Sequence, residues 1–198
     1  MVAGYSMLPP FLRKIDPSSA QDNGVYTETV FTHSDGLGSA HSIWWRPAVP
    51  LAESTVILFV PGNPGLAGFY TEYLSELHSR SPNIAILAHS HLAHTPKAID
   101  QSVFIDPSSV GLPAQLKSVI EALDAVKQTL QPKSIVLVGH SLGGWLCLQV
   151  RPSGVVLYRK VFRFRRYLKP ALKKSLALFY SSLCYAIWQQ HQTGGSYL

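Results

Sequence analysis

Two kinds of strand pattern are visible along the chain. Residues 25–31 alternate β-forming with polar side chains, as a half-exposed strand does, and residues 41–46 supply an antiparallel partner for them. By contrast, residues 55–60, 84–88 and 135–139 are continuous apolar runs, which are typical of parallel strands covered on both faces. We expect these three runs to be neighbouring parallel strands of one sheet.

Apolar residues at helical spacing predict helices at about 66–80 and 112–130. Strands and helices therefore alternate through the middle of the chain, which predicts a doubly wound α/β fold with a mostly parallel sheet. We expect residues 1–24 to be irregular, because they carry turn-forming residues instead of a periodic pattern. The alternation stops near residue 150, and residues 151–198 form a basic, aromatic tail.

The last of the apolar strands leads directly into the sequence Gly-His-Ser-Leu-Gly, in which Gly139 and Gly143 flank Ser141. A strand that turns into a helix through Gly-x-Ser-x-Gly forms a nucleophile elbow, because the glycines leave room for a strained turn that exposes the serine. We therefore interpret Ser141 as a candidate nucleophile. The alternative is that these residues form a tight strand-to-helix turn and nothing more.

A Pro-Gly-Asn-Pro-Gly loop follows the first of the continuous apolar strands. Gly62 and Gly65 allow the backbone to come close to a substrate oxygen. The N–H of Asn63, together with that of Leu142, could bind a tetrahedral oxyanion, since neither proline of the loop has an N–H to offer. The alternative interpretation of this loop is a rigid turn.

A serine nucleophile needs a general base, and the base needs an acid to orient it. No Asp or Glu follows Ser141, and His191 is the one histidine after it. Because His191 lies among glutamines near the end of the chain, we interpret it as a solvated residue. Upstream, His94 with Asp100 or Asp106 is the least implausible replacement pair.

Three histidines, His89, His91 and His94, lie close together after the strand at 84–88. Their spacing matches no common zinc pattern, and no cysteine or carboxylate lies beside them, so we expect them to pack within a loop. We predict neither a metal nor a cofactor. Cys147 and Cys184 make no disulfide framework, which favours a reducing compartment.

Composition and charge divide the chain. A hydrophobic fraction of 46% with 14% charged residues excludes a disordered protein. Residues 1–150 carry eight Lys and Arg against 11 Asp and Glu, whereas residues 151–198 carry nine Lys and Arg and no acid. Basic, aromatic and then apolar residues at 159–188 favour a membrane surface, and we expect no specific nucleic-acid partner. We predict neither a signal peptide nor a bilayer-spanning segment of about 18 apolar residues.

Residues 56–70 (VILFVPGNPGLAGFY), the loop with His94, and residues 138–150 (VGHSLGGWLCLQV) together resemble the lipid droplet-associated hydrolases, members of the α/β-hydrolase superfamily. The resemblance covers roughly residues 25–150. It implies serine ester hydrolysis of lipids or sterol esters, with Ser141 as the nucleophile. It also implies a location on lipid droplets or on the cytosolic side of the endoplasmic reticulum.

One departure from the family pattern is large. The family carries its acid and its histidine on later strands, and we find no resemblance after residue 150 and no acid there. We therefore expect an incomplete α/β-hydrolase fold, from a truncated, mis-spliced or frame-shifted product with little or no esterase activity. The alternative is a non-catalytic protein that binds lipid droplets or membrane surfaces.

Overall fold

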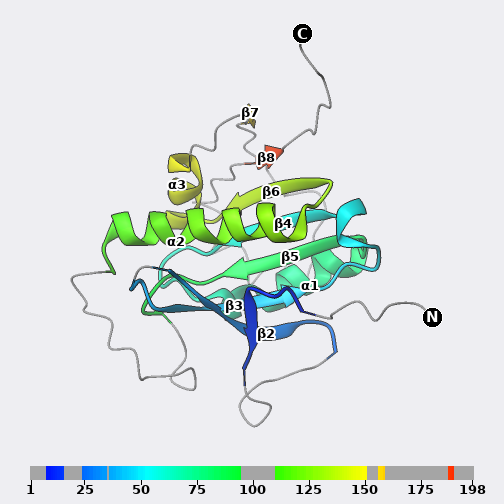
Figure 1. The fold of residues 1–198 in the computed structure, drawn as a ribbon, viewed down its shortest axis with the longest axis horizontal. Helices are drawn as coiled ribbons and strands as arrows, with labels where there is room; N and C mark the ends of the chain where they lie inside the picture. Colours follow the sequence, from blue (N-terminus) through cyan, green and yellow to red (C-terminus); the bar gives the residue numbers. More distant parts are fainter. Residues whose placement is uncertain are drawn as a thin grey trace, which may run out of the picture.

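The computed structural model is built around one mixed six-stranded sheet with helices on both of its faces (Figure 1). The structure describes residues 8–15, 24–34, 36–94, 110–150, 156–158 and 187–189. The strand order of the sheet is β1-β2-β3-β5-β4-β6. Strands β1, β2, β3 and β5 pair antiparallel in that order, whereas β5, β4 and β6 pair parallel.

The strands agree well with the hydrophobic pattern. Their bounds are β1 Leu12–Lys14, β2 Thr27–Thr32, β3 Ser39–Trp45, β4 Thr55–Val60, β5 Ile84–His89 and β6 Ser134–Gly139. The prediction that the three apolar runs are parallel neighbours is confirmed, with β4 between β5 and β6. The antiparallel pairing of β2 with β3 is also confirmed. One expectation was wrong: the N-terminal segment is not wholly irregular, because β1 pairs with β2.

The helices follow the strands in the expected order. Their bounds are η1 Leu51–Glu53, η2 Ala67–Tyr70, α1 Thr71–Arg80, α2 Leu112–Ala125, the π-helical turn η4 Val126–Leu130, and α3 Leu142–Gln149. The helix expected at 66–80 thus begins as a 3-10 turn, and the one expected at 112–130 ends in a π-helical turn. A separate two-stranded sheet pairs β7 Val156–Tyr158 with β8 Ile187–Gln189.

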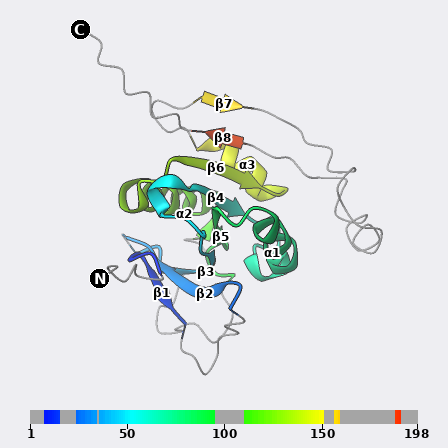
Figure 2. The ribbon, with the colours of Figure 1, turned by 90° about the vertical axis from the view of Figure 1, so that its right-hand side faces the viewer.

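Two apolar clusters hold these layers together, and α1 and α2 lie on opposite sides of the sheet (Figure 2). On β4, Leu58 belongs to the cluster that contains Val119 of α2 and Leu146 of α3. Its neighbour Phe59 belongs to the opposite cluster, with Leu74 of α1. Because successive side chains of a strand point to opposite faces, a central strand covered on both sides has to be apolar at every position.

A buried chain of polar groups fixes α2 to the sheet. The Glu121 carboxylate is hydrogen-bonded to His33 Nδ1 over 3.0 Å, and His33 Nε2 lies 3.0 Å from Ser118 Oγ. The same hydroxyl lies 2.9 Å from His89 Nε2, and His89 Nδ1 lies 3.0 Å from Ser42 Oγ. The order carboxylate, imidazole, hydroxyl resembles a catalytic triad. However, Ser118 is only 1% exposed, so no substrate can reach its hydroxyl, and we interpret this hydrogen-bonded series as a structural link between α2 and the sheet.

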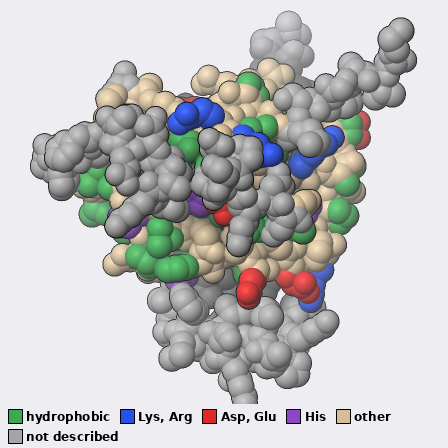
Figure 3. Space-filling model, turned by 90° about the horizontal axis from the view of Figure 1, so that it is seen from below, with side chains coloured by type: hydrophobic (Ala, Val, Ile, Leu, Met, Phe, Trp, Pro, Cys, Tyr) green, Lys and Arg blue, Asp and Glu red, His purple; other side chains and the backbone are tan. Residues whose placement is uncertain are grey.

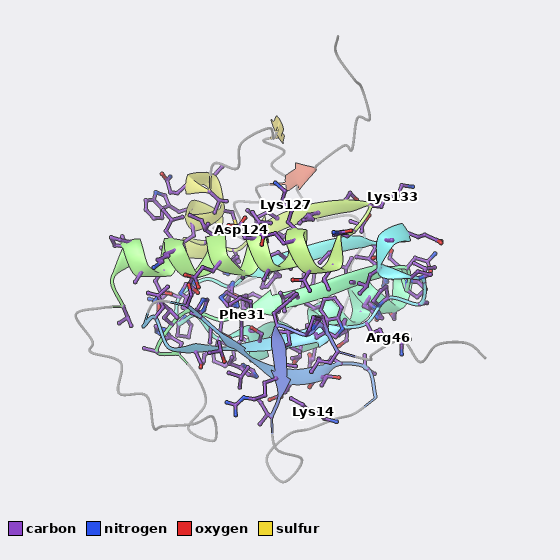
Figure 4. All side chains as sticks on the ribbon, in the orientation of Figure 1. Lys14, Phe31, Arg46, Asp124, Lys127 and Lys133 are labelled. Carbon is purple, nitrogen blue, oxygen red and sulfur yellow. The ribbon has the colours of Figure 1, made fainter. Side chains whose placement is uncertain are left out.

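The Phe31 ring packs against both histidines of this hydrogen-bonded series. Its ring lies 4.7 Å from the His33 ring and 5.3 Å from the His89 ring, centroid to centroid. The labelled side chain can be followed in Figure 4, where it comes from β2 on the side of the sheet that α2 covers. Burial therefore dominates both imidazoles, and it lowers the pKa of His33 and holds the pKa of His89 well below the usual 6.5.

We predict that mild acid destabilises the fold through these two histidines. Because both folded-state pKa values lie below 6.5, the unfolded chain binds more protons at these imidazoles than the folded chain as the pH falls through 6.5, and the free energy of unfolding falls with it. Urea denaturation at a series of pH values between 7 and 5 measures this slope. The double variant His33→Gln, His89→Gln should show a flatter slope, and an equal slope in both proteins would contradict the assignment.

Candidate active site

The backbone around Ser141 has the geometry of a nucleophile elbow. Ser141 lies between the end of β6 and the start of α3, with φ 50° and ψ −117°, and its side chain is exposed. A side chain at positive φ is strained by about 1–3 kcal/mol, and such strain persists only where the surroundings enforce it. The strand, sharp turn and helix predicted from the sequence are therefore present, and they hold Ser141 at the carboxyl edge of the parallel strands.

Two glycines make this turn possible. A Cβ on Gly139 would collide with the backbone of Gly143, and a Cβ on Gly143 would collide with the carbonyl oxygens of Val60 and Pro61. The first approach brings β6 against α3, and the second brings α3 against the end of β4. Because each clash is with backbone atoms, no side-chain rearrangement can relieve it.

The Pro61–Gly65 loop, which follows β4, touches the elbow directly. A Cβ built on Gly62 would lie 2.8 Å from His140 Nδ1 and 3.0 Å from the Cβ of Ser141. Three covalent bonds join that position to the Asn63 nitrogen, so this nitrogen lies at most about 8 Å from the Ser141 Cβ. The structure thus brings together Ser141 and the loop that the sequence suggested as its partner.

The hydrogen bonds of the loop single out one donor. The N–H of Gly62 donates to Tyr70 Oη over 3.2 Å, and the N–H of Gly65 donates to the Gly62 carbonyl over 2.6 Å. The two prolines have no N–H. Asn63 is an exposed residue, and its N–H has no hydrogen-bond partner among the described residues. This N–H is therefore able to donate a hydrogen bond to a substrate oxygen.

A second N–H lies on the elbow itself. The N–H of Gly143 donates to His140 O over 2.8 Å, and the N–H of Trp145 donates to Ser141 O over 3.1 Å. Leu142 is the first residue of α3, so its N–H has no acceptor within the helix. Two N–H groups near Ser141 therefore have no acceptor among the described residues: that of Leu142 on the elbow and that of Asn63 on the adjacent loop.

Tyr70 and His140 connect the loop to the elbow, and neither residue was among the candidates predicted from the sequence. Tyr70 Oη lies 2.7 Å from His140 Nδ1. Burial lowers the pKa of His140, so its imidazole is neutral at pH 7, and burial raises the pKa of Tyr70. Sequence signals existed, because Tyr70 follows the proline-glycine loop closely and His140 precedes the candidate nucleophile, but neither signal reveals their contact.

The three clustered histidines do not converge on one point. His89 belongs to the polar chain under α2, as described above, and His94 Nδ1 is bonded to Leu92 O over 2.9 Å. His91 supports the loop, since its N–H donates to Gly65 O over 2.9 Å and its ring fills the space that a Cβ on Gly65 would need. Burial lowers the pKa of His91 to about 4. The expected packing within the loop therefore holds for His91 and His94, whereas His89 is the last residue of β5 and packs beneath α2.

Other candidate residues lie outside the described part of the chain. Asp100 and Asp106, the suggested partners of His94, belong to this group, as do His191 and Cys184. Cys147 is described, and it is a buried free thiol. Within the described ranges, no group of three His, Cys, Asp or Glu side chains is placed to hold a metal ion. None of the helices there is both long and apolar enough to cross a bilayer.

Comparison with known proteins gives consistent matches. A family model described as "Lipid-droplet associated hydrolase" matches residues 53–173, more than half of the chain. The matched range continues past residue 150. We expected the resemblance to end there, at the change in composition, and that expectation was wrong. Residues 151–173 are thus basic and rich in aromatic side chains and still match the family model.

Curated relatives match a similar part of the chain. The lipid droplet-associated hydrolase of Drosophila melanogaster is 30% identical over 108 residues, covering 50% of this chain and 34% of the relative. The Mus musculus protein of the same name is 31% identical over 107 residues, covering 48% of this chain and 32% of the relative. The match therefore spans about a third of the length of these relatives.

Among solved structures, carboxyl esterase 2 from the fungus Tuber melanosporum aligns with a TM-score of 0.47 and 17% identity, over 71% of this chain and 43% of that one. An alpha-beta serine hydrolase homologue from Coxiella burnetii aligns with a TM-score of 0.39 and 15% identity, over 60% of this chain and 54% of that one.

We predict that Gly62→Ala separates the loop from the elbow. The new methyl group would lie 2.8–3.0 Å from His140 and Ser141, so we expect a loss of about 1–3 kcal/mol in the free energy of unfolding. Urea denaturation measures this loss. Gly68→Ala is the matched control, since a Cβ there meets nothing within 4 Å, and equal stabilities of the two variants would contradict the contact.

Proposed function

Because the chain belongs to the lipid-droplet associated hydrolase family, we propose that it carries the nucleophile and the oxyanion hole of a serine hydrolase that acts on lipid esters. One observation supports this most directly: an exposed serine in a strained elbow lies beside two N–H groups that have no described acceptor. An exposed hydroxyl beside backbone N–H groups without acceptors suits acyl transfer, in which negative charge develops on a carbonyl oxygen.

In the proposed reaction, Ser141 Oγ attacks the ester carbonyl carbon and its proton passes to a water molecule, because no side chain of this chain is assigned as the base. The carbonyl oxygen becomes an oxyanion, which accepts hydrogen bonds from the N–H groups of Asn63 and Leu142. Collapse of this intermediate expels the alcohol, which takes up the proton, and leaves an acyl-serine. Water then attacks the acyl group and releases the carboxylic acid. In this scheme Gly62, Gly65, Gly139 and Gly143 serve as the residues that let loop and elbow approach.

The substrate class we propose is an apolar ester. Two aromatic side chains near the site support it: Phe69, 67% exposed, immediately precedes Tyr70, and Trp145, 44% exposed, lies one helical turn after Ser141. Exposed aromatic side chains bind apolar groups readily. The corresponding place of action is the surface of a lipid droplet or the cytosolic side of the endoplasmic reticulum, with residues 159–188 as the contacting segment.

The charge distribution is compatible with this location. On the face of the molecule shown in Figure 3, Lys and Arg side chains and Asp and Glu side chains both occur among hydrophobic and neutral groups. The excess of positive charge belongs instead to residues 151–198, which hold nine Lys and Arg and no acid. An attraction to anionic lipid headgroups would therefore come from that segment.

A second candidate function is non-catalytic binding to lipid droplets or membranes. The observation that favours it is in the sequence: no Asp or Glu follows Ser141, so the acid that the family carries after its nucleophile has no counterpart in this order. In that case the elbow and loop would persist as structure, and the chain would hydrolyse esters slowly or not at all.

We predict that a fluorophosphonate probe labels Ser141, while turnover of a short-chain nitrophenyl ester stays low. An oxyanion hole without a base retains a rate roughly 10³–10⁴-fold above water, far below that of a complete triad. Mass spectrometry of the labelled protein and a spectrophotometric assay measure the two quantities. Ser141→Ala should abolish the labelling at this position and the residual turnover.

Ser79→Ala is the matched control, because Ser79 is an exposed serine on α1, away from the elbow. Labelling that survives in Ser141→Ala would show that another residue is the nucleophile. Absence of labelling in the wild type would favour the binding function. Rapid turnover that disappears in Ser141→Ala would instead show that a working base and acid are present, and the expected impairment would be wrong.

A further inference from the structure

We propose that Tyr70 is a positioning residue of the oxyanion hole. Its hydroxyl accepts a hydrogen bond from the Gly62 N–H and so holds the loop in the conformation in which the Asn63 N–H can donate to the substrate oxyanion. This inference rests on the proposed function of Ser141 as a nucleophile. Its physical basis is the pair of hydrogen bonds that join Tyr70 Oη to the Gly62 nitrogen, over 3.2 Å, and to His140 Nδ1, over 2.7 Å.

The first of these bonds has a fixed direction. A peptide N–H can only donate, so the Tyr70 oxygen accepts from Gly62. The bond to His140 can run either way, because a phenol oxygen can accept two hydrogen bonds and also donate one. In the arrangement tested below, the phenolic proton is donated to His140 Nδ1, 2.7 Å away, and the neutral imidazole carries its own proton on Nε2. In both directions the hydroxyl joins a loop peptide to the residue before Ser141.

The hydroxyl can do this because its ring is held in place. Tyr70 ends η2 and directly precedes α1, and its half-buried ring packs on Phe59 of β4 with centroids 4.7 Å apart. Phe59 is 2% exposed and belongs to the core between the sheet and α1. Since the ring is anchored to the rigid core, the position of Oη is defined independently of the loop that it contacts.

The far end of the loop is held by a different group. The His91 N–H donates to Gly65 O over 2.9 Å, and the Gly65 N–H donates back to Gly62 O over 2.6 Å. With Gly62 fixed by Tyr70 and Gly65 fixed by His91, the peptide between Gly62 and Asn63 has little freedom to rotate. Its N–H direction is therefore set before any substrate binds, which is the preorganisation that an oxyanion hole requires.

Loss of the phenol hydroxyl should release this arrangement. Without it, the Gly62 N–H has no acceptor and His140 Nδ1 loses its donor, while the ring itself can stay in the core. The loop then gains orientations in which the Asn63 N–H points away from the developing charge. Removing an oxyanion donor outright costs about 10²–10³ in rate, so we expect a smaller loss, about tenfold, from loosening one.

The test compares Tyr70→Phe with Tyr73→Phe, which removes a phenol hydroxyl from the same apolar cluster but leaves the Gly62–Tyr70–His140 bonds in place. The measured quantity is the rate of Ser141 phosphonylation by a fluorophosphonate, with the maximal rate and the probe concentration for half-maximal rate determined separately. We expect the maximal rate to fall about tenfold in Tyr70→Phe, with the half-saturating concentration changed less than about twofold. The Tyr73→Phe rate should stay within about twofold of wild type. Equal rates in the two variants would overturn the proposal.

A second readout separates this proposal from the proposed function. Nuclear magnetic resonance of the wild type should show His140 with its proton on Nε2, and slow hydrogen exchange at the Gly62 amide. In Tyr70→Phe, Gly62 exchange should accelerate at least tenfold and the His140 tautomers should become mixed. If Ser141 is never labelled but these changes occur, the hydrogen bonding of Tyr70 to the loop stands and the proposed function fails. Unchanged Gly62 exchange in the variant would overturn the role of Tyr70 regardless of labelling, and a wild-type His140 protonated on Nδ1 would overturn the direction given to its bond with Tyr70.

Discussion

The close approach of three backbone segments is the constraint on which the rest of this site depends. The end of β4, the turn after β6 and the first turn of α3 come so near to one another that Gly139 and Gly143 cannot carry a Cβ. Because the parallel pairing of β4 with β6 extends to Val60 opposite Gly139, the loop after β4 and the elbow after β6 emerge at the same level. Everything proposed for Ser141 requires that coincidence.

The same approach explains why the loop is rich in glycine and proline. Gly62 lies against His140 and Ser141, and Gly65 lies against the His91 ring, so both positions exclude side chains. The prolines remove two potential donors. The Gly62 N–H donates to Tyr70 and the Gly65 N–H donates to Gly62 O, so the Asn63 N–H remains. The loop thus keeps one N–H without an acceptor among the described residues, because its other N–H groups are bonded or replaced by proline.

Membership of the hydrolase family rests on residues 53–173, whereas the absence of acids concerns the sequence after Ser141. The family match, residues 53–173, includes the loop, the elbow and all three parallel strands. The charge asymmetry begins only after residue 150. The elbow geometry at Ser141 therefore coexists with a later sequence that contains no acid. The elbow requires only the first of these parts, whereas the proposed catalysis requires both.

The sequence by itself determined the elements that depend on local pattern. The apolar runs at 55–60, 84–88 and 135–139 predicted parallel strands because burial on both faces leaves no polar position, and Gly-x-Ser-x-Gly predicted the elbow because its backbone strain is local. The helices at 66–80 and 112–130 were predictable for the same reason, although their 3-10 and π-helical turns were not. Such features involve residues within a few positions of one another.

Only the tertiary structure decided which distant polar groups meet. Tyr70 and His140 are 70 positions apart, and His33 and Glu121 are 88 positions apart. A hydrogen bond between such residues depends on how sheet and helices stack, and no spacing in the sequence encodes it. The short strand β1 escaped prediction similarly, because three residues carry too little periodicity and owe their conformation to pairing with β2. Local pattern thus specifies the parts of this protein, while the packing of the sheet against its helices selects the contacts that position them.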